Sequence, residues 1–190
     1  NFLDSALMLL AASTTTFAQN AVGSFSLQPK AGISIADMTD IQGTTSRIGF
    51  VGGLEGEYQA SDIFSLSLGV NYSQEGFKMK NSDNKIKLDY INVPILANVY
   101  LTKGLAVKVG VQPGFNVGNS VTVDGNTTSS SKKDYDGIKS VALSIPVGLS
   151  YEISNVVLDA RYNWGVTKAF DGLDSKNSVF QVTIGYKFQL

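Results

Sequence analysis

Strict alternation of apolar and polar residues dominates the chain from Phe25 onward and constrains its fold more than any other feature. A period of two residues is typical of β-strands with one apolar face, whereas an amphipathic helix repeats every 3.6 residues. Eight segments show it: residues 25–36, 47–58, 63–79, 86–101, 105–118, 140–153, 156–167 and 178–190. Each is far longer than a usual strand of about 5–6 residues. The sequence therefore predicts an all-β chain built from eight long strands.

The apolar faces of these segments are almost purely hydrophobic. The exceptions are Pro29, Gly52, Gly56 and Pro113, and no position on these faces carries a charged or amide side chain. The opposite faces are rich in Gly, Ser, Asn, Lys and Glu. Strands of this length can cross an apolar band about 25 Å tall at the tilt of a membrane barrel.

Composition narrows the function classes. Charged residues make up 16% of the chain, against about 25% in an average soluble protein. Histidine and cysteine are both absent, which excludes disulfides, haem or zinc held by these side chains, cysteine nucleophiles and triads with an imidazole base. We therefore expect no enzyme activity, no cofactor and no metal. A net charge of −1 without a basic block argues against a nucleic-acid partner.

An apolar run at residues 6–12, followed by Thr16 and Ala18 at the spacing of a cleavage site, predicts a signal peptide over residues 1–18. The barrel domain would then span residues 19–190. A short amphipathic helix of the mature protein is the alternative for the first segment. The rest of the chain has no run of about 20 apolar residues, so entry into a membrane would require a closed barrel.

The predicted connections alternate strictly between long and short. They cover residues 37–46, 59–62, 80–85, 102–104, 119–139, 154–155 and 168–177. Outer-membrane barrels have short periplasmic turns and longer extracellular loops. The fold class expected is therefore an eight-stranded antiparallel up-and-down transmembrane β-barrel with both ends of the barrel domain on the periplasmic side.

The charged residues of the polar faces are the candidate site. They are Lys30, Glu55, Glu57, Glu75, Lys108, Glu152, Asp159, Arg161 and Lys187. In a membrane barrel they face the lumen, where we expect Asp159 to pair with Arg161 and Lys30 to pair with the Glu55 and Glu57 face. A lumen plugged by this polar network is the leading prediction, and a narrow pore is an alternative.

A soluble lipocalin-like barrel would instead turn its apolar faces inward around an apolar ligand. Alternation alone cannot distinguish the two arrangements. Low charge and the small residues of the polar face favour the membrane barrel, because small side chains suit the interior of an eight-stranded barrel.

Residues 119–139 form the longest predicted connection and are rich in Ser, Thr and Asn. Loops on a rigid scaffold often carry recognition, so this segment is the best candidate for contact with an external partner. A plain solvated loop is the alternative.

Several short sequences resemble the PorT type of outer-membrane β-barrel protein. They are Leu88-Asp89-Tyr90-Ile91-Asn92-Val93-Pro94-Ile95-Leu96, Gly110-Val111-Gln112-Pro113-Gly114-Phe115, Gly148-Leu149-Ser150-Tyr151-Glu152, Arg161-Tyr162-Asn163-Trp164-Gly165 and Gly185-Tyr186-Lys187-Phe188. The resemblance implies a barrel in the outer membrane of a Gram-negative cell, surrounded by outer-membrane lipid. It also implies insertion by the barrel-insertion machinery through the C-terminal strand, and an extracellular or secretion-system protein as partner. It implies a structural, assembly or surface-recognition role, with no catalytic residues.

Overall fold

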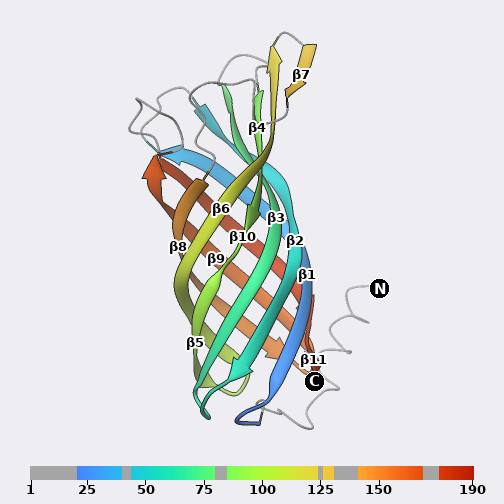
Figure 1. Ribbon diagram of the computed structural model, residues 1–190, viewed down its shortest axis with the longest axis vertical. Coiled ribbons are helices and arrows are strands. Elements are labelled where there is room, and N and C mark those ends of the chain that lie inside the picture. Colours follow the sequence, from blue (N-terminus) through green and yellow to red (C-terminus); the bar gives the residue numbers. More distant parts are fainter. Residues whose placement is uncertain (1–20, 40–43, 80–84, 124–125, 131–140, 169–175) are drawn as a thin grey trace, which may run out of the picture.

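The computed structural model describes residues 21–39, 44–79, 85–123, 126–130, 141–168 and 176–190, and these residues form a β-barrel. Its strands are β1 (Phe25–Thr39), β2 (Thr44–Gln59), β3 (Phe64–Met79), β4 (Lys85–Asn92), β5 (Ile95–Thr102), β6 (Leu105–Val123), β7 (Asn126–Ser130), β8 (Val141–Ile153), β9 (Val156–Lys168), β10 (Lys176–Tyr186) and β11 (Phe188–Gln189). Figure 1 shows the strands steeply tilted around a common axis, with short turns at one end.

The barrel closes between its first and last long strands. β1 pairs antiparallel with β10, with Ile33 opposite Val182, and each other barrel strand pairs antiparallel with its neighbour. β4 and β5 follow one line between β3 and β6, and β10 and β11 follow one line beside β1. Counted this way, the described chain forms eight barrel strands. The predicted eight-stranded antiparallel up-and-down barrel is confirmed.

The gap between β4 and β5 falls at Val93 and Pro94. Proline has no backbone N–H and cannot donate to a strand ladder. Hydrogen bonds continue on both sides of the gap: the Val93 N–H donates to the Pro113 carbonyl at 2.8 Å, and the Gly69 N–H donates to the Pro94 carbonyl at 2.9 Å. The break therefore interrupts the regular ladder without opening the barrel wall.

The orientation of the two faces decides between a membrane barrel and a soluble calyx. Phe50, Leu66, Val109 and Leu158 lie on four different strands, and each is between 45 and 51% exposed on the outside of the barrel. Every position of the predicted apolar faces is exposed or half-exposed. Such a continuous apolar surface is stable in lipid and not in water. The soluble lipocalin-like alternative is therefore wrong.

The short turns lie at the end of the barrel that also holds the start of β1 and the C-terminus, where the Leu190 N–H donates to the Phe25 carbonyl at 2.9 Å. Gly104, in the turn between β5 and β6, has φ of +85°, and Ser154, in the turn between β8 and β9, has φ of 57°. Positive φ is favourable for glycine and strained for most other residues. By the usual topology of outer-membrane barrels, this end faces the periplasm.

One expectation from the sequence needs correction. Residues 119–139 were expected to form a loop, but β6 continues to Val123 and then pairs with β7. Residues 120–123 and 126–128 are rich in β-branched side chains, which favour extended pairing over an irregular loop. The lumen also holds apolar groups, because Val51, Leu88, Leu96 and Val179 are buried inside the barrel.

No helix among the described residues is long and apolar enough to span a bilayer. The predicted signal peptide, residues 1–18, lies outside the described residues.

Candidate functional site: the charged lumen

The interior of the barrel contains a cluster of five charged side chains at its centre, which we call the central cluster: Lys30, Glu55, Lys108, Asp159 and Arg161. They come from β1, β2, β6 and β9, and each is almost completely buried. Strand alternation places them inward, because their apolar neighbours in sequence occupy the lipid-facing side.

Glu55 is the hub of the central cluster. It pairs with Lys30 from the adjacent strand, with Lys108 Nζ at 2.9 Å and with Arg161 Nη2 at 3.2 Å. Asp159 pairs with two of these three cations: its carboxylate lies 3.1 Å from Lys108 Nζ and 3.0 Å from Arg161 Nη2. Contacts from β2 to β6 and β9 therefore cross the lumen and do not only join neighbouring strands.

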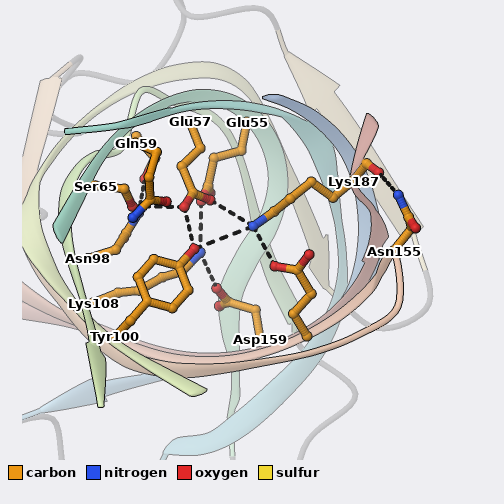
Figure 2. Close-up of polar contacts among 12 residues, drawn as sticks. Glu55, Glu57, Gln59, Ser65, Asn98, Tyr100, Lys108, Asn155, Asp159 and Lys187 are labelled. Carbon is orange, nitrogen blue, oxygen red and sulfur yellow. Dashed lines mark hydrogen bonds and ion pairs between the residues drawn. The ribbon is translucent and has the colours of Figure 1, made fainter. Parts of the chain in front are cut away.

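A second group, the periplasmic cluster, surrounds Lys187 and consists of Glu57, Tyr100, Glu152 and Lys187. The Lys187 ammonium lies 3.1 Å from Glu57 and 2.7 Å from Glu152, and the Tyr100 hydroxyl donates to Glu57 (Figure 2). The Lys187 ammonium also donates to the Tyr100 hydroxyl oxygen at 3.4 Å, so two carboxylates and one hydroxyl oxygen accept from its three N–H donors.

Local backbone geometry positions Lys187 in this cluster. It lies in the gap between β10 and β11, and its N–H donates to the Asn155 carbonyl at 2.7 Å. The Asn155 side chain donates back to the Lys187 carbonyl at 2.8 Å. The turn between β8 and β9 therefore holds the C-terminal strand segment at the point where the charged side chain enters the barrel.

Glu75, the remaining predicted site residue, lies apart from both clusters. It is buried on β3, and Ser73 Oγ donates to its carboxylate at 2.8 Å. Ser73 Oγ also accepts from the Asn92 amide at 2.7 Å. The structure thus places all nine predicted residues inside the barrel, eight of them in two paired clusters and Glu75 beside a set of uncharged polar groups.

Several lumen residues were not predicted from the sequence. Tyr100 contacts Glu57, Ser65 Oγ donates to Glu57 at 2.7 Å, and Asn98 donates to Ser65 at 3.0 Å (Figure 2). Strand alternation indicates that Tyr100 and Asn98 face the lumen, because both lie on the face opposite Val99. A tyrosine in a strand is as easily an outer-face residue, so its polar role was not apparent from residue type.

The chemistry available to these clusters is ion pairing. Each buried carboxylate of the two clusters already pairs with at least one cation. Within the described residues, no group of three or more acidic side chains is arranged to hold a metal ion. Gly53 allows β2 to approach β3 closely, because a Cβ there would lie 2.1 Å from the Val70 carbonyl oxygen and 2.5 Å from Asn71 Oδ1.

At the opposite end from the periplasmic turns, β6 and β7 form a hairpin that extends beyond the rest of the barrel (Figure 1). Five residue pairs join the two strands, from Asn119 opposite Ser130 to Val123 opposite Asn126. In the part of the chain that the structure describes, β7 pairs with no strand other than β6. The hairpin is therefore a projecting feature built on a rigid scaffold.

Comparisons with known proteins agree with this architecture. Residues 17–171 match the family described as outer membrane protein beta-barrel domain. Neisserial surface protein A is 20% identical, with a TM-score of 0.58, over 86% of this chain and 97% of that protein. The attachment invasion locus protein Ail of Yersinia pestis is 18% identical, with a TM-score of 0.54, over 88% of this chain and 99% of Ail. Comparison with curated proteins gives no match.

At these identities the two solved structures show a shared fold and nothing finer. The family match, in contrast, covers most of the chain, including the strands that supply the central cluster. Its description agrees with the apolar outer face and the polar interior. The chain therefore belongs to the outer membrane protein β-barrel domain family and is an integral protein of the cell outer membrane.

Proposed function

We propose that this protein is a non-catalytic outer-membrane barrel with a plugged lumen, which acts through its extracellular segments in surface recognition or assembly. The observation that carries the proposal is the Glu55 hub. Its pairs with Lys108 and Arg161 join three strands across the barrel interior, where a solute would have to pass.

Charge balance supports the plug. The two clusters contain four cations and four carboxylates, and each of these groups lies within ion-pair distance of a group of opposite charge. Passage of an ion would require these buried pairs to separate, and breaking such a pair costs about 3–5 kcal/mol. The narrow-pore alternative would need a continuous gap beside the clusters.

The extracellular side supports the recognition role. Asn126 and Thr127 of the β6–β7 hairpin are exposed, and the hairpin extends beyond the rest of the barrel (Figure 1). If no solute passes through the lumen, the extracellular segments are the part of the barrel that can bind molecules outside the cell. An extracellular or secretion-system protein is the class of partner we propose.

Two further parts of the proposal concern the membrane itself. Outer-membrane lipid contacts the apolar faces, and the barrel-insertion machinery would bind the C-terminal strand, whose Phe180, Val182, Ile184 and Tyr186 all face outward. The narrower assignment to the PorT type stays a prediction.

The test separates folding from recognition. In one variant, residues 121–139 are replaced by a short Asn-Gly turn, and a matched control shortens the turn at residues 60–62. We expect the hairpin variant to fold and insert normally but to fail in restoring the phenotype of a deletion strain of the source bacterium. Full complementation by the hairpin variant would contradict a recognition role for this segment.

A further inference from the structure

A small polar cavity lies inside the barrel beside Glu75, away from the two charged clusters. Its volume is about 30 Å³, and its lining includes Glu75, Asn92, Gln112, Ser144, Asn163 and Val179. Six different strands supply these six residues, so the cavity lies within the lumen and not on the lipid-facing surface.

Several polar atoms of the lining have no protein partner. Among the described residues, no group hydrogen-bonds to Asn163 Nδ2, Asn163 Oδ1 or Gln112 Oε1, although both residues are buried. A buried amide without a partner is unfavourable, because the group loses its hydrogen bonds to water and gains none in return. Native proteins satisfy such groups with protein atoms or with ordered water.

The size and chemistry of the cavity match water. One water molecule needs about 10–15 Å³ of volume measured in this way and two to four polar partners, so about 30 Å³ accommodates two. Asn163 offers both a donor and an acceptor, Gln112 offers an acceptor, and Ser144 and Asn92 add further polar groups. Purely apolar cavities stay dry, but five of the residues that line this one have polar side chains.

We infer that two ordered water molecules bind in this cavity and bridge the amide side chains of Gln112 on β6 and Asn163 on β9. The lumen then contains a layer of directly paired charges and, next to it, a hydrated layer of uncharged amides. The waters link β6 and β9, which the Lys108–Asp159 ion pair also joins in the central cluster.

The direct test is solution NMR of the wild-type barrel in deuterated detergent micelles, with the side-chain amides assigned. We expect nuclear Overhauser effects between water and the Asn163 amide protons, with a residence time longer than that of surface water. Absence of these effects, with the amide resonances visible, would overturn the inference.

Asn163→Leu gives an independent test, because leucine keeps the branching pattern of asparagine and has methyl groups in place of both polar atoms. With a hydrated cavity, the variant loses the bridging bonds, and the unfolding equilibrium constant should rise about tenfold. With a dry cavity, removing an unsatisfied amide should leave stability unchanged or increase it. Asn98→Leu is the matched control, because Asn98 donates to Ser65 and Ser67 and its loss must destabilise the barrel in either case. If Asn163→Leu does not fold, the NMR result on the wild type decides.

Discussion

Neutralising Glu55 is the sharpest test of how the charged lumen contributes to stability. Glu55 takes part in three of the five ion pairs of the central cluster, with Lys30, Lys108 and Arg161. In Glu55→Gln the shape of the side chain is kept, but three buried cations are left with Asp159 as the only carboxylate of the cluster. Breaking a buried pair costs about 3–5 kcal/mol. Because the amide oxygen can still accept a hydrogen bond, we expect a loss of about 3 kcal/mol.

The assay is urea unfolding in phospholipid vesicles, followed by the fluorescence of Trp164. Trp164 is the only tryptophan of the chain, and it is 62% exposed on the outer face, so its emission reports transfer from lipid to water. Glu152→Gln is the matched control. Glu152 makes one ion pair, and its side chain is 13% exposed, so we expect a loss of about 1 kcal/mol. Equal losses for the two variants, or no loss for Glu55→Gln, would refute the hub role of Glu55.

Three further predictions concern the outer face, the wall and the periplasmic cluster. Leu158→Arg places a charge in the lipid-facing band and should destabilise the barrel by about 2–4 kcal/mol in vesicle unfolding. Unchanged stability of this variant would show that the face is solvated and would contradict the lipid-facing assignment. Gly110→Val should prevent folding, seen as loss of the heat-modifiable band on gels, because a Cβ there would lie 1.9 Å from the Ile95 carbonyl oxygen; normal folding would contradict this close approach. Lys187→Met leaves Glu57 and Glu152 without their shared cation and should lower the free energy of unfolding by about 3 kcal/mol in the same assay. An unchanged free energy of unfolding would show that these ion pairs do not stabilise the barrel.

Strand alternation predicted the barrel and which residues share a face, while the low charge and the small residues of the polar face indicated which face points outward. Because side chains in a strand point alternately to opposite sides, one correct register fixes the direction of every residue in that strand. The outward positions of Phe50 and Leu158 and the inward positions of Glu55 and Arg161 follow from it. The local pairing of Asp159 with Arg161 also follows, since the two residues lie two apart on one face.

Contacts across the lumen could not be predicted in this way. Glu55 and Arg161 are 106 residues apart, and their meeting depends on the stagger of the strands around the barrel, which alternation does not specify. Leu88 and Leu96 lie on the inward face by alternation and are buried in the lumen, although residue type alone would place a leucine in the lipid-facing band. The hairpin at residues 119–130 was missed because its polar composition resembles that of a loop.

Ion conductance through the wild-type barrel tests the central claim most directly. Refolded protein would be added to a planar lipid bilayer in 1 M KCl, with insertion verified independently by the emission of Trp164 in vesicles of the same lipid. If the paired clusters plug the lumen, the inserted barrel produces no discrete current steps at 100 mV. Stable single-channel currents that disappear in Arg161→Ala or Glu57→Ala would contradict the plug and establish the narrow pore.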